Sequence, residues 1–195
     1  MSEKVCTFAD GNMNYTAHYD SPLGGITLAS DGRALTGLWF LTSSVFDNKV
    51  FGSPSGCDGQ KHFGSTLGPL ASLPAQLPVF DEACRWLDIY FSGRKPDFIP
   101  PLSLKGTPFQ QRVWKELLTI PYGQTVTYGE LARRLGCRSA QAVGGAVGHN
   151  PISIIVPCHR VLPATGTLGG YAGGRSRKQA LLQLEKGTPH GLFEE

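Results

Sequence analysis

Residues 127–160 read TYGELARRLGCRSAQAVGGAVGHNPISIIVPCHR, and this stretch contains two short helical patterns followed by an apolar run. Thr127 and Glu130 have the spacing of a capping box, which predicts that a helix begins there and runs to Gly136. After a short turn, Ser139 is placed to open a second helix. Two short helices joined by a turn of three or four residues form the helix-turn-helix pattern, which is typical of DNA-binding domains but also occurs in ordinary helical packing.

The apolar run that follows is rich in β-branched residues and predicts a buried strand over residues 152–156. It leads into the adjacent pair Cys158 and His159, flanked by Pro157 and Arg160. A cysteine is a useful nucleophile only as the thiolate, and a nearby histidine or arginine lowers its pKa. Neighbours on an extended strand point to opposite faces, so proton transfer within the pair would need a bend or a bridging water. The alternative is a buried structural cysteine beside a surface histidine.

Glu185 is expected near the end of a helix over residues 175–186, four residues after Leu181 and on the same inward face. A buried carboxylate is unfavourable unless it accepts hydrogen bonds, and a histidine is a natural donor. A relay of Cys158, His159 and Glu185 is therefore one interpretation. A solvated glutamate at a helix end is the other, because spacing in the sequence does not establish proximity in space.

The N-terminal part of the chain shows a different pattern, with predicted strands, a long loop and one helix. Residues 15–40 predict a hairpin of strands, because Asp31-Gly32 separates two apolar, partly alternating runs. Residues 43–75 are rich in Ser, Gly and Pro without periodicity, which predicts a long loop. Pro78 then opens a helical pattern that Gly93 is expected to stop. The residues expected on the inward stripe of this helix are Phe80, Ala83, Cys84, Leu87 and Phe91.

Three prolines between residues 95 and 106 predict a connecting segment. We place the linker at residues 99–106, between an N-terminal domain over 1–98 and a C-terminal domain over 107–195. Beyond the linker, Thr107-Pro108 is a favourable N-cap and first-turn pair for another helix. The inward face of that helix and its end are expected to carry Phe109, Val113, Leu117 and Ile120.

With 195 residues, 41% of them hydrophobic and 17% charged, the chain has the composition of a globular protein rather than a disordered one. No apolar run reaches the roughly 18 residues that a membrane span needs, and the N-terminus lacks the apolar core of a signal peptide. Five cysteines, an odd number, form no disulfide framework. These features predict a protein of the cytoplasm, or of the nucleus in a eukaryote.

The other cysteines, at positions 6, 57, 84 and 137, are interpreted as structural residues. Cys57 and His62 are five residues apart, and that spacing matches no strong zinc pattern. We therefore expect no metal site.

Charge is distributed unevenly along the chain. Residues 1–104 contain 7 Lys/Arg and 10 Asp/Glu, whereas residues 105–195 contain 11 Lys/Arg and 5 Asp/Glu. A basic C-terminal half suggests a polyanionic partner. The alternative is a solvated surface with a chance imbalance.

Several motifs follow one another in a fixed order: GTPFQ at 106–110, YGQTVTY at 122–128, NPI at 150–152, PCHR at 157–160 and GGYAGG at 169–174. Together they resemble the O6-alkylguanine-DNA alkyltransferase family. The resemblance is close over about residues 105–187 and looser over about 15–100, where SPLG at 21–24 also matches. It implies an α+β fold, with a ribonuclease-H-like N-terminal domain and a mostly helical, winged-helix-type C-terminal domain.

The resemblance also implies a methylated-DNA–protein-cysteine methyltransferase. Such a protein binds double-stranded DNA in the minor groove and flips out an alkylated guanine, because the stacked duplex blocks attack on the base. It transfers the alkyl group to its own cysteine and reacts once, since a thioether has no easy route back to a thiol. The implied protein works as a monomer without a cofactor, and alkylthymine stays open as a second substrate.

The family's roles fall on matching positions of this chain. Cys158 corresponds to the alkyl acceptor, His159 to the residue that takes the thiol proton through a water, and Glu185 to the carboxylate that orients this histidine. Asn150 corresponds to the hinge after the recognition helix, whereas Arg160 is interpreted as a structural support. The residues expected to contact DNA are Tyr128 (also the leaving base), Gly129, Ala140, Gln141 and Gly145, and those expected to wall the substrate pocket are Val161, Tyr171, Ala172 and Gly173.

Gln141 departs from the family pattern, because most relatives carry an arginine there that enters the base stack. Two other functions remain as alternatives. A cysteine hydrolase using Cys158 and His159 would need an oxyanion hole, and no motif for one stands out. A pure DNA-binding module, like the alkyltransferase-like proteins, would lack the cysteine that this chain has at position 158.

Overall fold

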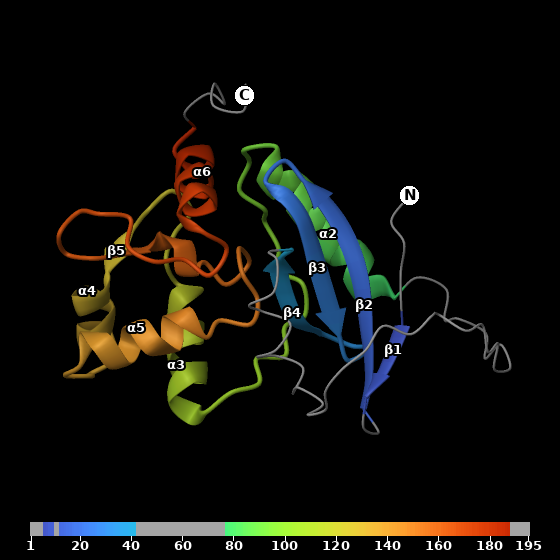
Figure 1. Ribbon diagram of the computed structural model, residues 1–195, viewed down its shortest axis with the longest axis horizontal. Helices are drawn as coiled ribbons and strands as arrows, with labels where there is room; N and C mark the ends of the chain where they lie inside the picture. Colours follow the sequence, from blue (N-terminus) through green and yellow to red (C-terminus); the bar gives the residue numbers. More distant parts are fainter. Residues whose placement is uncertain (1–5, 10–11, 42–76, 188–195) are drawn as a thin grey trace, which may run out of the picture.

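The computed structural model describes residues 6–9, 12–41 and 77–187 (Figure 1). The N-terminal half forms an antiparallel sheet in the order β1 (Cys6–Ala9), β2 (Asn12–Ser21), β3 (Gly24–Ser30) and β4 (Leu35–Phe40). The predicted turn at Asp31-Gly32 joins β3 to β4, and the Asp31 carboxylate accepts hydrogen bonds from the backbone N–H groups of residues 33 and 34. Among the described residues, no helix has the length and apolar character needed to cross a bilayer.

Helix α2 (Pro78–Phe91) lies against one face of this sheet, where it contacts β2 and β3 (Figure 1). The helix begins at the expected proline, and Gly93 follows its end with a φ of +79°. Of the predicted inward stripe, Phe80, Ala83 and Leu87 are buried, whereas Cys84 and Phe91 are half-buried and pack against the margin of the core. The buried face of α2 is wider than the predicted stripe and includes Trp86 and Tyr90, of which Tyr90 reaches residues of the C-terminal half. The buried residues of α2 are Val79, Phe80, Ala83, Trp86, Leu87 and Tyr90.

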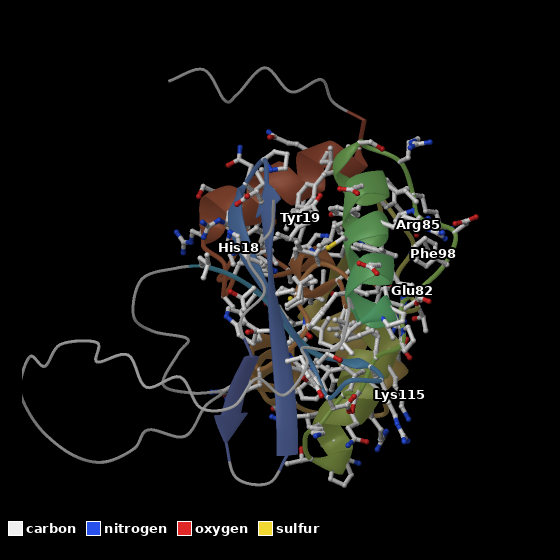
Figure 2. The ribbon with its side chains drawn as sticks, turned by 90° about the vertical axis from the view of Figure 1, so that its right-hand side faces the viewer. His18, Tyr19, Glu82, Arg85, Phe98 and Lys115 are labelled. Carbon is white, nitrogen blue, oxygen red and sulfur yellow. The ribbon has the colours of Figure 1, made fainter. Side chains whose placement is uncertain are left out.

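The segment expected as a linker is packed on the N-terminal half. Leu35 forms a parallel bridge to Leu102, with hydrogen bonds from Leu35 N to Pro101 O at 2.8 Å and from Ser103 N to Leu35 O at 2.7 Å. Before this bridge, Phe98 lies under the guanidinium of Arg85, 4.5 Å from the ring centre (Figure 2). The bridge of Leu35 to Leu102 covers part of the outer edge of β4, which would otherwise present unpaired backbone groups.

The rest of that edge receives a segment of the C-terminal half. Leu38 forms a second parallel bridge, to Ile152, in which Leu38 N donates to Pro151 O at 2.9 Å and Ser153 N donates to Leu38 O at 2.8 Å. The N-terminal sheet therefore holds the chain a few residues before Cys158.

The C-terminal half consists of α3 (Pro108–Leu117), β5 (Val126–Thr127), α4 (Tyr128–Arg134), α5 (Ala140–Gly148), β6 (Val161–Leu162) and α6 (Arg175–Glu185). The three predicted N-caps are confirmed, since Thr107, Thr127 and Ser139 each accept a hydrogen bond from a backbone N–H three residues later. Helices α4 and α5 form the expected helix-turn-helix pair, although α4 ends before Gly136. Helix α3 packs on α5, where Trp114 Nε1 donates to Ala146 O at 2.8 Å.

The predicted strand over residues 152–156 is wrong. These residues are buried, as the apolar run indicates, but they form a compact turn in which Ile154 has a φ of +68°. The Asn150 amide closes this turn, because its Oδ1 accepts from Ile152 N at 3.1 Å and its Nδ2 donates to Val156 O at 2.8 Å. The apolar run therefore correctly indicated that these residues are buried, but it did not indicate their backbone conformation. The turn continues into a single turn of 3-10 helix, η1 (Cys158–Arg160).

Candidate active site

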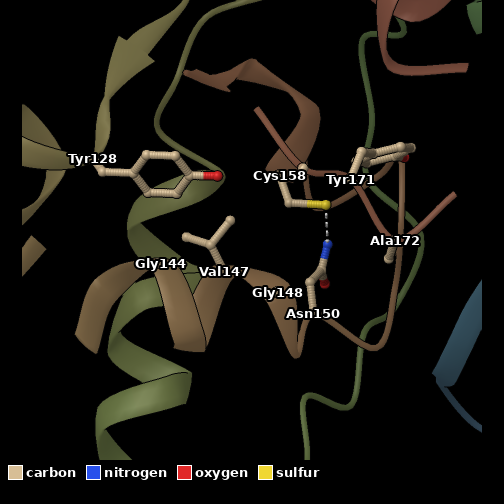
Figure 3. A pocket seen from close by; sticks show the side chains of 9 residues that line it. Tyr128, Gly144, Val147, Gly148, Asn150, Cys158, Tyr171 and Ala172 are labelled. Carbon is tan, nitrogen blue, oxygen red and sulfur yellow. Dashed lines mark hydrogen bonds between the residues drawn. The ribbon is translucent and has the colours of Figure 1, made fainter. Parts of the chain in front are cut away.

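A pocket of about 350 Å³ opens between the N-terminal end of α4, the last turns of α5 and the segment before α6 (Figure 3). The hydroxyl of Tyr128 points across it toward Cys158 (Figure 3). Its lining consists of small and apolar residues around one thiol and one amide, which suits a flat ligand that needs close backbone approach. The lining residues are Tyr128, Gly144, Val147, Gly148, Asn150, Cys158, Gly170, Tyr171 and Ala172.

Cys158 is the nucleophile candidate in this pocket. Its side chain is held by Asn150, whose Nδ2 donates to Sγ at 3.1 Å while also bonding the backbone of the preceding turn (Figure 3). Burial raises the pKa of the thiol, and the hydrogen bond from Asn150 and the positive charge of Lys178 oppose that rise without cancelling it. The thiol is therefore protonated at neutral pH, and its reaction requires a base.

His159 can act as that base. Its Nε2 lies 2.7 Å from Glu185 Oε1, and both side chains are fully buried. Because the carboxylate can only accept, Nε2 carries the ring proton, which leaves Nδ1 as a proton acceptor. Nδ1 is buried and has no hydrogen-bond partner among the described residues. Burial lowers the pKa of His159 although Glu185 works in the opposite direction, so the ring is neutral at physiological pH.

Glu185 is the centre of a buried hydrogen-bond network. Besides His159, its carboxylate accepts from Tyr90 Oη at 2.7 Å, from Gly123 N at 3.0 Å and from Arg160 through Nε at 2.8 Å and Nη2 at 3.0 Å. Burial would raise the pKa of this carboxyl, but His159 and Arg160 outweigh it and lower the pKa to about 2. Glu185 is therefore ionised, and the alternative of a solvated helix-end glutamate is wrong.

Arg160 connects this network to the backbone, because its Nη1 donates to Ile120 O at 2.7 Å while the same guanidinium donates to the Glu185 carboxylate. The fork geometry suits a carboxylate.

Lys178 is a buried cation that the sequence interpretation missed. Its Nζ donates to Val161 O at 2.8 Å and lies 3.3 Å from Gly170 O, which ties α6 to the pocket wall. Burial lowers the pKa of Lys178, and its interaction with Cys158, which is favourable when the thiol is ionised, opposes this shift. The signal was present, since Lys178 precedes Glu185 by seven residues and therefore lies on the same face of the helix.

The structure separates the expected residues into three groups. Tyr128, Asn150, Cys158, Tyr171 and Ala172 line the pocket. Val161 and Gly173 are buried and do not line it. Four expected DNA contacts lie outside the pocket on the exposed surface of α4 and α5, namely Gly129, Ala140, Gln141 and Gly145.

Glycines of α5 were also missed as pocket residues. Gly144 and Gly148 line the pocket from that helix, and a Cβ at Gly144 would lie 3.6 Å from the Tyr128 ring. Small residues at spacing i, i+4 on a helix were the available signal, because they mark a face that a ligand or ring approaches closely.

Within the described part of the chain, no group of three or more His, Cys, Asp or Glu residues could hold a metal ion. Cys57 and His62, whose spacing matches no strong zinc pattern, lie outside the described residues. Cys84 and Cys137 are half-buried away from the pocket.

Comparisons with known proteins extend over both halves of the chain. Residues 14–104 match the ribonuclease-like domain of 6-O-methylguanine DNA methyltransferase, and residues 108–187 match the DNA binding domain of the same family. Methylated-DNA–protein-cysteine methyltransferase of Mycobacterium bovis is 47% identical over 173 residues, which cover 87% of this chain and 92% of that protein. The Haemophilus influenzae protein of the same name is 40% identical over 174 residues, which cover 88% of this chain and 86% of that protein.

Solved structures agree with these matches. The crystal structure of Mycobacterium tuberculosis O6-methylguanine methyltransferase is 44% identical with a TM-score of 0.69, over 89% of this chain and 93% of that one. The crystal structure of the Mycobacterium tuberculosis protein in complex with DNA is 44% identical with a TM-score of 0.68. The match covers 89% of this chain and 94% of that one. These likenesses confirm the expected α+β class, with a ribonuclease-like domain followed by a helical DNA-binding domain. The chain belongs to the 6-O-methylguanine DNA methyltransferase family.

Proposed function

We propose that this protein repairs DNA by direct reversal, taking the alkyl group of an O6-alkylguanine onto Sγ of Cys158. The observation that supports the proposal is a buried thiol in a pocket, next to a histidine that can act as its base. The fully buried Glu185 carboxylate holds the ring proton of His159 on Nε2, which leaves Nδ1 able to accept a proton. In the reaction the S–C bond forms as the bond from the alkyl carbon to O6 breaks. The thiol proton passes to His159 Nδ1 through a bridging water, and guanine leaves as an anion. Guanine then takes up one proton from solvent, and His159 returns its proton to solvent, so that the thiol proton is balanced by the one that guanine gains.

Double-stranded DNA is the proposed partner, and the alkylated guanine must leave the base stack to reach Cys158. The exposed surface of α5 supports close approach to a groove, because Ala140, Ala142, Gly145 and Gly148 are all small. The half of the chain that carries this helix has the excess of Lys and Arg. The relative solved in complex with DNA supports the same partner.

Tyr128 is proposed to contact the flipped nucleotide and the leaving base, since its hydroxyl points into the pocket toward Cys158 (Figure 3). Burial and the proximity of Cys158 raise its pKa, so it keeps its proton as a hydrogen-bond donor. Asn150 is the proposed hinge, because one amide holds both the turn after α5 and the reacting sulfur.

A titration of the protein with a duplex that contains a single O6-methylguanine tests this function. We expect methyl transfer to stop at one group per protein molecule, however large the excess of duplex. Continued turnover on DNA, or on an ester or amide substrate, would instead establish a hydrolase. Binding of the duplex without transfer would establish a DNA-binding module.

Three further properties are part of the proposal. We place the domain boundaries at residues 98 and 107, with the segment 99–106 docked on β4. We expect a monomer, because the pocket and its relay are built from one chain. The cytoplasm, or the nucleus in a eukaryote, is the proposed location because the substrate is DNA.

Gln141 gives a test of the DNA-binding surface. It is the second residue of α5 and is exposed, at the position where the family resemblance implies an arginine in the base stack. We expect Gln141→Arg to tighten duplex binding. The slope of log affinity against log salt concentration should become steeper by about 1, the value for one added phosphate contact, because the new charge releases a counterion from the DNA. Fluorescence anisotropy at several salt concentrations measures both effects.

The matched control for this variant is Gln179→Arg, which adds the same charge at an exposed position of α6. It should change the salt slope much less. Equal effects of the two variants would show that Gln141 does not lie at the intercalating position.

A further inference from the structure

We infer that Tyr90, which belongs to α2 of the N-terminal half, is a positioning residue of the relay in the C-terminal half. The inference rests on the proposed function. Tyr90 is fully buried, and its hydroxyl donates to Glu185 Oε1 at 2.7 Å. The same hydroxyl lies 3.4 Å from His159 Nε2, so the phenol, the carboxylate oxygen and the imidazole meet at one point.

The Tyr90 ring is fixed by aromatic packing on several sides. It stacks on Trp86 at 5.2 Å between ring centres, and it meets Phe91 and Tyr122 edge-on at 5.4 Å and 6.0 Å. A ring held in this way delivers its hydroxyl to one place, which is the condition for setting the orientation of another side chain. Packing alone does not require the hydroxyl, so its contact with Glu185 is a separate feature.

The hydroxyl acts on the relay through the charge of Glu185. Burial and the carboxylate keep the pKa of Tyr90 well above its ordinary value, so the phenol stays a donor. Its hydrogen bond occupies the oxygen that also faces His159, and it thereby reduces the negative charge acting on the imidazole. Without that bond, Glu185 Oε1 would be held by fewer donors, so the carboxylate and the imidazole hydrogen-bonded to it would be oriented less firmly and Nδ1 would be placed less well to accept the thiol proton. The pKa of His159 would also rise, because the negative charge of Glu185 would act on the ring with less shielding.

The other titratable or charged groups that face His159 and Glu185 come from several elements. They are Arg160 and Cys158 of η1, Lys178 of α6, Tyr122 after α3 and Tyr171 before α6. Tyr90 alone among these groups comes from the N-terminal half. Seating of α2 against the C-terminal half therefore completes the relay, which gives the N-terminal domain a direct part in the chemistry.

Tyr90→Phe tests this inference, because it removes one oxygen and keeps the ring and its packing. We expect the single-turnover rate of methyl transfer at pH 7 to fall about tenfold, as for the loss of a hydrogen bond to a charged group. The acid limb of the pH–rate profile should move up by roughly one pH unit, because a less shielded carboxylate raises the pKa of His159. An NMR titration of the His159 ring in the DNA-free protein should show the same upward shift.

Tyr19→Phe is the matched control. Tyr19 also lies beside α2, and its hydroxyl donates to a carboxylate of that helix, Asp88 Oδ1, at 2.8 Å (Figure 2). This control should leave the rate and the pH profile unchanged. If Tyr90→Phe lowers only the melting temperature, or leaves the acid limb and the His159 titration in place, Tyr90 is a packing residue and the inference is wrong. The NMR titration needs no alkyl transfer, so it separates this failure from failure of the proposed function in the wild type.

Discussion

Replacing Cys158 by serine is expected to abolish alkyl transfer and to leave binding to the methylated duplex intact. A serine hydroxyl is far harder to deprotonate than a thiol, so the relay has no nucleophile to activate. The substitution is small, and the Asn150 amide that now donates to Sγ can donate to the hydroxyl in the same place. Intact-protein mass spectrometry after incubation with O6-methylguanine duplex should find no adduct, while fluorescence anisotropy should find the wild-type affinity.

Cys84→Ser is the matched control, because Cys84 is half-buried on α2 and lies outside the pocket. That variant should form the full adduct. An adduct on the Cys158→Ser protein would mean that another cysteine accepts the alkyl group.

Glu185→Gln is expected to slow methyl transfer by about 100-fold or more, the usual scale for loss of an effective general base. The amide has one oxygen where the carboxylate has two, so it cannot serve all the donors that meet there, and it no longer fixes the proton of His159 on Nε2. Arg160 would lose its buried counter-ion, which costs about 3–5 kcal/mol. For a chain of this size, such a loss lowers the melting temperature by about 10 °C.

The rate must therefore be measured well below the melting temperature of the variant. The control is Glu82→Gln, at an exposed position of α2 (Figure 2), which also removes one negative charge. It should change neither the rate of methyl transfer nor the melting temperature. A folded Glu185→Gln protein that transfers methyl at the wild-type rate would reduce Glu185 to a structural role.

The features that could be predicted from the sequence are those decided by local contacts. Thr127 and Ser139 cap their helices through atoms three residues away, so the helix-turn-helix pair could be placed closely. Glu185 could be predicted to face inward, because helical periodicity fixes its side relative to Leu181.

Features that depend on distant contacts could not be predicted. Beyond the single bridge of Ile152 to Leu38, the chain over residues 152–156 turns back, and the Asn150 amide holds this turn at both ends. A β-branched run in the sequence does not reveal such a turn. Tyr90 reaches Glu185 across 95 residues of sequence, so its role depends on how α2 packs against the other half. The segment 99–106 carries prolines typical of a linker, yet Leu102 bridges to the strand edge at Leu35.

Peptide mapping of the wild-type protein tests the central claim most directly. After incubation with excess duplex containing O6-methylguanine, the protein is digested and every cysteine-containing peptide is analysed by tandem mass spectrometry. The account predicts one methyl group per molecule, all of it on Cys158, and an equal amount of unmodified guanine in the DNA. A methyl group on another cysteine, or repaired guanine in excess of protein, would contradict it.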